Sequence, residues 1–127
     1  MTKSILNIVL WGIGNHAEKN LLPAIKCSEK YNLYGIVTRK KDKLDQISNK
    51  YECMAWEDYD EMLSDPSIDI VFLSTPPLLH FDQGMKIMKA GKHFFCEKPL
   101  SIDLQSTIEL LNFAEKNQLA ICEALMY

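Results

Sequence analysis

Residues 5–17 read ILNIVLWGIGNHA, and this stretch decides the fold. Its first part, Ile5 to Leu10, is almost entirely apolar and predicts a buried strand. A turn with two glycines, Gly12 and Gly14, follows and leads into a helix that begins near Asn15. A GxGxxA pattern between a buried strand and a helix is typical of a phosphate-binding loop in a βαβ unit. The alternative is an ordinary glycine-containing turn.

Three positions of this loop have an expected role in holding a dinucleotide. Gly12 would make the tight turn, Gly14 would let the backbone approach a pyrophosphate, and Ala17 would let the helix pack closely on the strand. The helix N-terminus offers free amides and a partial positive charge to phosphate groups. His16 either lines this phosphate site or is a solvated residue at the start of the helix.

Strand and helix patterns alternate along the whole chain. The strands are expected at residues 5–10, 33–37, 53–56, 68–73, 92–96 and 119–122, and the helices at 15–30, 42–51, 59–63, 80–90 and after 103. Pro23 predicts a kink or a junction of two short helices, and Gly91 is expected at the C′ position of its helix. The alternation predicts a doubly wound α/β fold, the Rossmann fold, with a parallel sheet in the order 3-2-1-4-5-6 between two helical layers.

The last predicted helix has an N-cap and an apolar face. Asp103 is a good N-cap residue. Leu104, Ile108 and Leu111 follow it at helical spacing and are expected on one face of the helix.

Composition limits the class of protein. The chain has 127 residues, which predicts one domain over residues 1–127. The net charge of −3 argues against a nucleic-acid partner. No apolar run approaches 18 residues, so no membrane span is expected. The N-terminus lacks the pattern of a signal peptide, and cysteine usage fits a reducing compartment, so we expect a cytoplasmic protein.

The four cysteines predict no metal site. Cys27, Cys53, Cys96 and Cys122 are far apart and form no CxxC pair. Cys96 and Cys122 lie in apolar runs, and we interpret both as small buried hydrophobic residues.

The end of the second predicted strand bears on the choice of cofactor. NAD-binding domains place an acid there for the ribose hydroxyls, whereas NADP-binding domains place an arginine nearby for the 2′-phosphate. Here the strand is followed by Thr38 and Arg39, and the first acid is Asp42, already in the next helix. We therefore expect NADP, with NAD as the second choice. A solvated basic turn is the alternative interpretation.

Polar residues also follow the fourth predicted strand. Ser74 and Thr75 could contact ribose or phosphate through their hydroxyls, and Pro76 would hold the loop extended. A turn that simply ends the strand is the alternative. His80 opens the next helix and is either a polar contact of the cofactor or a capping residue.

The tripeptide Glu97-Lys98-Pro99 follows the fifth predicted strand. Ligands of open α/β sheets bind just beyond the carboxyl ends of the strands. Lys98 could stabilise a developing alkoxide beside a reacting alcohol or ketone. Glu97 could orient Lys98 or hold ribose hydroxyls. The alternative is a surface ion pair.

Taken in order, these motifs resemble the N-terminal half of the glucose–fructose oxidoreductase, inositol dehydrogenase and rhizopine catabolism family (Gfo/Idh/MocA). The matching stretches are residues 12–17 with 22–24, 63–65 with 69–71, 74–76 with 80, 90–93, 97–100 and 123–127. The resemblance covers essentially the whole chain, and the ordered set is more specific than any single motif. One departure is Pro77, where the family more often has asparagine.

The resemblance implies a Rossmann domain that binds NAD(P) and assigns the following positions. The pyrophosphate would lie at Gly12, Ile13, Gly14, Asn15 and His16, and the adenosine ribose at Thr38 and Arg39. Thr75, Pro76 and His80 would lie along the cofactor, with Glu97 and Lys98 near the nicotinamide. The Lys98–Pro99 peptide is often cis in similar proteins.

The resemblance also implies an NAD(P)-dependent dehydrogenase or reductase that moves a hydride between the nicotinamide and a sugar, cyclitol or diol. Members are more than twice this length, and their second domain holds the substrate, supplies a proton donor and often forms a homo-oligomer interface. We expect this chain to carry only the first domain and to be inactive alone. The alternatives are a stand-alone NAD(P)-binding regulatory module and a non-catalytic fragment.

Overall fold

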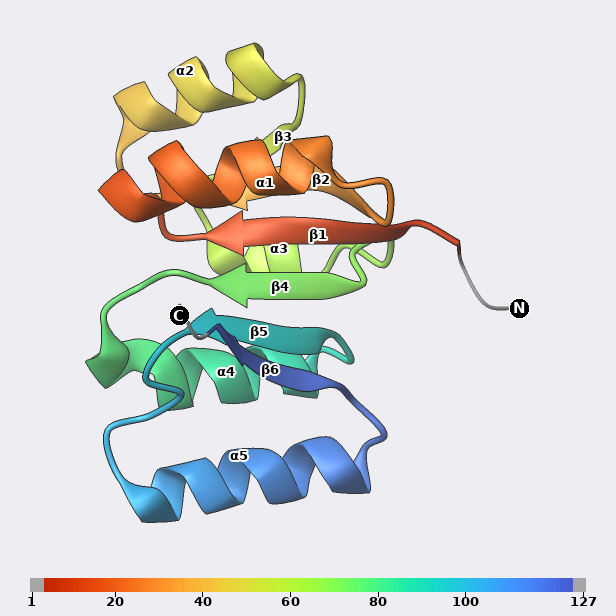
Figure 1. Cartoon of the computed structure of the whole chain (residues 1–127), viewed down its shortest axis with the longest axis vertical. Coiled ribbons are helices and arrows are strands. Elements are labelled where there is room, and N and C mark those ends of the chain that lie inside the picture. Colours follow the sequence, from red (N-terminus) through yellow and green to blue (C-terminus); the bar gives the residue numbers. More distant parts are fainter. Residues whose placement is uncertain (1–3, 125–127) are drawn as a thin grey trace.

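The computed structural model describes residues 4–124 and confirms the doubly wound α/β fold (Figure 1). Six parallel strands form one sheet in the order β3-β2-β1-β4-β5-β6. The strands are β1 (Leu6–Trp11), β2 (Tyr31–Val37), β3 (Met54–Trp56), β4 (Ile70–Leu73), β5 (His93–Glu97) and β6 (Ile121–Ala124). The helical elements are η1 (Ala17–Leu21), α1 (Leu22–Cys27), α2 (Lys41–Tyr51), α3 (Tyr59–Leu63), η2 (Pro77–Leu79), α4 (His80–Lys89) and α5 (Leu104–Lys116). Residues 125–127, part of the last matching stretch, lie outside the described residues.

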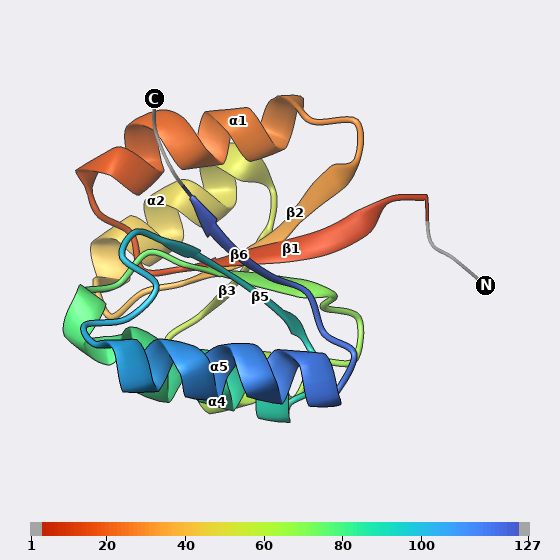
Figure 2. The same cartoon turned by 60° about the horizontal axis from the view of Figure 1, so that its bottom comes forward.

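Helices cover both faces of the sheet. Figure 2 shows α1 and α2 on one face and α4 and α5 on the opposite face. Alternate residues of β1 enter the two resulting cores, with Leu10 in the core under α1 and α2 and Val9 in the core under α4 and α5. Both side chains are fully buried, as expected for a central parallel strand. Among the described residues, no helix has the length and apolarity needed to cross a membrane.

The first helical segment divides at the proline, as the sequence predicts. The π-helical turn η1 precedes α1, and Pro23 lies in the first turn of α1, where a missing backbone donor costs little. The Leu22 N–H donates to the carbonyl of Ala17, five residues earlier, which is the hydrogen bond of a π turn. The segment ends at Cys27, before residue 30, because Ser28 is already extended.

The predicted caps of the later helices are also present. The side chain of Asp103 accepts a hydrogen bond of 2.7 Å from the Ser106 N–H at the start of α5. Gly91 follows the C-cap Ala90 of α4 with a φ of 81°, a backbone conformation that favours glycine.

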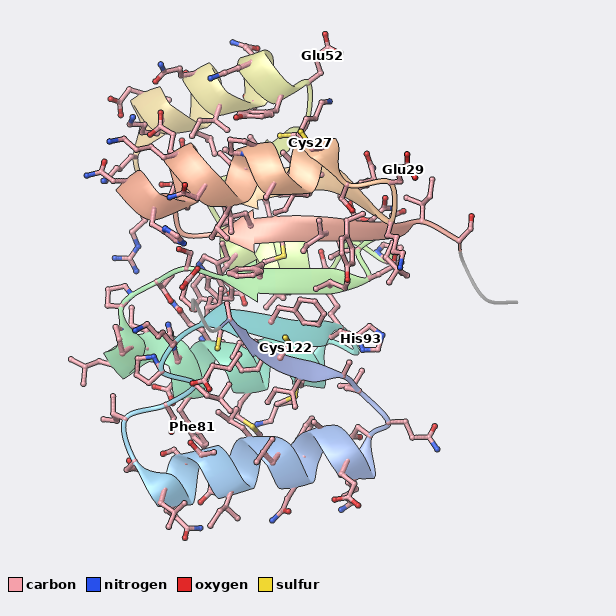
Figure 3. All side chains as sticks on the ribbon, in the orientation of Figure 1. Cys27, Glu29, Glu52, Phe81, His93 and Cys122 are labelled. Carbon is pink, nitrogen blue, oxygen red and sulfur yellow. The ribbon has the colours of Figure 1, made fainter. Side chains whose placement is uncertain are left out.

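The predicted apolar face of α5 is present in the helix but does not meet the core. Leu104, Ile108 and Leu111 are 75%, 40% and 45% exposed, whereas Leu110 and Ala114 are buried. Apolar residues occur on two faces of this helix, so helical spacing alone did not fix which face meets the core. The interpretation of Cys122 is wrong. It is exposed on β6, which pairs with β5 at the edge of the sheet that the described residues form (Figure 3), whereas Cys96 is fully buried as expected.

Candidate functional site

A cavity of about 640 Å³ lies at the carboxyl edge of the sheet, a volume typical of small-molecule and cofactor sites. The strands end at this edge, and in Figure 1 the arrowheads of β1, β4 and β5 point to the same side. Three segments that the sequence places in the candidate site contribute to the wall. These are residues 12–14 after β1, residues 38 and 39 after β2, and residues 74–76 after β4. Lys40 and Leu79 line the cavity beside them.

The glycine loop has the geometry that its two glycines predict. Gly12 has a φ of 98°, and a Cβ added to it would lie 2.7 Å from the carbonyl oxygen of Ser74. The Gly12 N–H donates to the Val37 carbonyl at 2.9 Å, which ties the loop to β2. A Cβ added to Gly14 would meet no atom within 4 Å. The space above Gly14 is therefore open, and a pyrophosphate would fit there.

The residues after β2 form the basic side of the cavity. Thr38 is buried, and its Oγ1 accepts a hydrogen bond of 3.2 Å from the Lys40 N–H, which shapes the turn. Arg39 is exposed and lines the cavity. Asp42 lies in the first turn of α2, and the acid that lines the cavity in the described part of the chain is Glu57, between β3 and α3. Sequence reasoning missed Glu57 because no motif marks it.

Two aromatic rings form another part of the wall. Trp11 ends β1 and Tyr59 begins α3, and their ring centroids are 4.8 Å apart in a stacked arrangement. The Lys86 ammonium lies 4.6 Å from the centroid of the Tyr59 ring and 2.8 Å from its hydroxyl oxygen. This hydrogen bond raises the pKa of Lys86. Sequence reasoning missed these rings, although an indole directly before the glycine turn was a usable signal.

His16 and Glu97 bring two of the predicted site segments together. The His16 Nε2 lies 3.2 Å from Oε1 of Glu97, so the glycine loop reaches the end of β5. The Asn20 amide lies 3.0 Å from the His16 Nδ1 and can donate to it, which leaves Nε2 as the donor toward the carboxylate. Asn15 is exposed beside them and does not line the cavity.

Lys98 lies just beyond the contact between His16 and Glu97 and is exposed. The Lys98–Pro99 peptide is cis. The following Leu100 N–H donates to the Glu123 carboxylate at 2.6 Å, which anchors the loop to β6. Burial and the nearby Glu123 raise the pKa of the Cys96 thiol to about 12, so this thiol stays protonated and unreactive. The exposed Lys98 ammonium and the partly exposed Glu97 carboxylate are thus both accessible at the end of β5.

His80 has a different position from the other predicted site residues. Its side chain has no exposed surface, and both ring nitrogens contact backbone carbonyls. This placement argues against a direct contact between the ring and a bound nucleotide. Groups of three or more residues able to hold a metal ion are absent from residues 4–124.

The fold and the cavity together define a nucleotide-binding α/β domain. A glycine loop precedes a helix N-terminus at the carboxyl edge of a parallel sheet, where such domains bind dinucleotides. The chain belongs to the Gfo/Idh/MocA family, whose model is described as an oxidoreductase family with an NAD-binding Rossmann fold and matches residues 6–124.

Several relatives act on sugars. The chain is 29% identical over 126 residues to the dTDP-3,4-didehydro-2,6-dideoxy-alpha-D-glucose 3-reductase of Streptomyces violaceoruber, covering 99% of this chain and 37% of the relative. It is 29% identical over 130 residues to the D-xylose 1-dehydrogenase (NADP(+)) of Hypocrea jecorina, covering 91% and 33%. The chain spans about a third of the length of these curated relatives.

The fold also matches solved structures. KijD10, a 3-ketoreductase from Actinomadura kijaniata solved with NADP and TDP-benzene, superposes with a TM-score of 0.90 at 24% identity. The match covers 94% of this chain and 37% of that one. At this identity the comparison establishes the fold.

Proposed function

We propose that this chain is the NADP-binding domain of an oxidoreductase that acts on a sugar, cyclitol or diol. The observation that carries the proposal is the cavity at the carboxyl edge, where the open glycine loop and the basic turn after β2 share one wall. Family membership supports the nicotinamide cofactor, and the sugar reductase and xylose dehydrogenase relatives support the substrate class.

The cavity and the strand ends suggest how the cofactor lies. The adenosine would occupy the part bounded by Arg39, Trp11 and Tyr59, with the 2′-phosphate at Thr38 and Arg39. The pyrophosphate would lie over Gly14, where no atom blocks the backbone. The nicotinamide would extend toward the end of β5. His16 and Asn15 would then flank the phosphates, and Glu97 would meet the nicotinamide ribose.

The residues of this chain would prepare the reaction and leave its completion to another domain. The bound cofactor would supply or accept the hydride. The Lys98 ammonium would stabilise negative charge on the reacting oxygen. A second domain, of the kind that the longer relatives have room for, would hold the substrate and supply the proton donor. We also propose a cytoplasmic location and a homo-oligomeric full-length enzyme, without a nucleic-acid partner.

Titration calorimetry on the chain tests this function. We expect NADPH to bind, and to bind more tightly than NADH, because the site offers Arg39 to a 2′-phosphate and no acid at the end of β2 to ribose hydroxyls. Tighter binding of NADH would contradict the choice of cofactor, and binding of neither would contradict the function.

A stand-alone NAD(P)-binding regulatory module would have the same cavity. The exposed Lys98 favours the enzyme, because a sensor needs no ammonium where a substrate would react. We expect the chain alone to oxidise or reduce no sugar. In a longer protein that contains this chain, loss of turnover in Lys98→Met with unchanged NADPH affinity would support the enzyme. Unchanged turnover would favour the module.

A further inference from the structure

His80 joins two loops from beneath the candidate site. It is the first residue of α4 and is completely buried. Its Nδ1 lies 2.6 Å from the carbonyl oxygen of Pro99, in the loop after β5. Its Nε2 lies 2.8 Å from the carbonyl oxygen of Thr75, in the loop after β4. One ring therefore connects Thr75, which lines the cavity, to Pro99, the residue that follows Lys98.

The partners of this ring determine its protonation state. A neutral imidazole donates from one nitrogen and has a lone pair on the other, and a carbonyl oxygen can only accept. The two contacts of His80 can therefore both be hydrogen bonds only when both ring nitrogens carry protons. In a neutral ring, one contact would bring two lone pairs together inside a buried site, where an unsatisfied polar group is costly.

The surroundings of His80 contain charged groups of both signs, and these favour or disfavour a cationic ring. Glu97 ends β5 and Glu123 lies on β6, where its carboxylate holds the Leu100 N–H next to Pro99. Asp82 lies in the first turn of α4. These three carboxylates lie on elements around the ring, and a carboxylate close to the ring would favour its cationic form.

The opposing influences are the complete burial of the ring, which disfavours its charged form, the N-terminal end of α4 and the Lys98 ammonium. Cys96, which is held protonated, contributes no charge. On α5, Asp103 is already used as the N-cap. The direct contacts of the ring, two carbonyl oxygens, are both acceptors, and they are the closest groups to its nitrogens.

We propose that His80 is a positioning residue whose doubly protonated ring joins the loops after β4 and β5 and thereby fixes Lys98 beside the cofactor site. The role of Lys98 in this inference rests on the proposed function, whereas the bridge rests on the two contacts of the ring. Deprotonation removes one of the two hydrogen bonds, so one loop is released while the other stays attached. The position of Lys98 then depends on pH although His80 never touches the cofactor.

Thr75 links the bridge to the cavity. Its carbonyl accepts from His80, and its hydroxyl donates to the side-chain oxygen of Gln83 in α4. Thr75 and Gln83 both line the cavity. A change at His80 is therefore transmitted to the cavity wall on one side and to the Lys98 loop on the other.

Nitrogen-15 NMR of the histidine rings is the direct test. The chain has three histidines, and His80→Gln identifies the signals of His80. At about pH 6 we expect the two ring nitrogens of His80 to have nearly equal shifts, as in an imidazolium. As the ring loses its second proton, the Pro99 carbonyl carbon and the Lys98 amide should shift together with the ring nitrogens. His80→Gln should abolish these coupled shifts.

His93 is the matched control. It lies at the opposite end of β5 (Figure 3), and its Nδ1 is 2.9 Å from the Ala120 N–H, so this nitrogen accepts. We expect the two ring nitrogens of His93 to have well-separated shifts, because Nδ1 accepts a hydrogen bond. We expect His93→Gln to leave the Pro99 and Lys98 shifts unchanged.

Two results would overturn the bridge. The first is a His80 ring that stays in one neutral tautomer from about pH 5 to 8, and the wild-type spectrum decides this even if His80→Gln does not fold. The second is a chemical shift of the Lys98 amide that stays constant while the His80 ring changes its protonation state. NADPH calorimetry on the same sample separates the two proposals. Binding with a neutral ring refutes only the bridge, and an imidazolium without binding refutes only the proposed function.

Discussion

The two edges of the sheet differ in whether their cationic side chains have partners within the protein. At the amino edge, polar side chains bond to one another and to the backbone. The Tyr34 hydroxyl donates to Asp65 at 2.8 Å, Lys92 donates to the carbonyls of Asp65 and Ile68, and the Asn7 N–H donates to Asp69 at 2.7 Å. At the carboxyl edge, the side chains of Arg39 and Lys98 have no hydrogen bond or ion pair within the described part of the chain.

This difference suggests that polar groups at the amino edge contribute to stability, whereas those at the carboxyl edge contribute to ligand binding. Polar groups that are bonded inside the protein stabilise the fold, because a buried group without a partner is costly. Polar groups left available at the carboxyl edge can bind a ligand instead. Substitutions at the amino edge should therefore change stability without changing affinity. Substitutions at the carboxyl edge should change affinity, except where the backbone itself is constrained.

The two glycines of the loop compare a constrained backbone position with an open one at the carboxyl edge. Substitution of the constrained glycine should have the largest effect on stability. Gly12→Ala should lower the free energy of unfolding by about 2–4 kcal/mol, because the new Cβ meets the Ser74 carbonyl at a φ that disfavours alanine. Gly14→Ala is the matched variant. It should fold normally, because its Cβ enters open space, and should weaken NADPH binding by occupying the pyrophosphate position. Urea denaturation and calorimetry measure both, and unchanged NADPH affinity in Gly14→Ala would contradict the pyrophosphate assignment.

Arg39→Ala should change affinity alone. Removing the guanidinium should weaken NADPH binding about tenfold, which corresponds to about 1.4 kcal/mol, and leave NADH binding unchanged. Its exposed side chain has no partner whose loss would destabilise the fold. Lys116→Ala, in the last turn of α5, is the control for loss of a surface cation. An equal loss for both cofactors would show that Arg39 does not contact the 2′-phosphate.

Tyr34→Phe should change stability alone. It removes the hydroxyl that donates to Asp65 and should lower the free energy of unfolding by about 1 kcal/mol, with NADPH affinity unchanged. Tyr51→Phe, at the end of α2, is the control, since the Tyr51 hydroxyl has no hydrogen bond among the described residues. Weaker binding of NADPH by Tyr34→Phe would contradict the claim that substitutions at the amino edge change stability without changing affinity.

Acid should produce the smallest effect, through Asp65. The Ser67 N–H and the Tyr34 hydroxyl donate to this carboxylate and, with the Lys92 charge, hold the pKa of Asp65 below its usual value. A carboxyl with a lowered folded-state pKa stabilises the fold fully above its unfolded value of about 3.9 and loses that contribution as the pH falls through the folded pKa. Urea midpoints measured toward about pH 3 should therefore fall less steeply in Asp65→Asn than in the wild type. Equal slopes would refute the role of Asp65.

The fold was predictable because its signals are local. The strand before Gly12, the break at Pro23 and the cap at Asp103 each depend on neighbouring residues, and the structure agrees with all three. The buried face of α5 was not predictable, because both faces carry apolar residues and tertiary packing decides between them. The exposure of Cys122 depends on β6 lying at the edge of the sheet, which its own apolar run does not reveal.

The candidate site was predictable where it follows strand ends. The residues after β1, β2 and β4 share one cavity because parallel strands end at the same edge. Glu57 and Tyr59 come from the segment between β3 and α3, whose path over the sheet is a tertiary property. The contacts of His80 could not be foreseen either, because they join backbone carbonyls 5 and 19 residues away.

The indole in the cavity wall gives the protein an optical reporter of its own. The chain has two tryptophans, and Trp11 lines the cavity while it stacks on Tyr59. Indole emission overlaps the absorption band of reduced nicotinamide, so excitation energy passes from Trp11 to a reduced cofactor that binds within the same cavity. With Trp56→Phe as the background, quenching of Trp11 and sensitised emission from the cofactor would follow binding in real time, without any label.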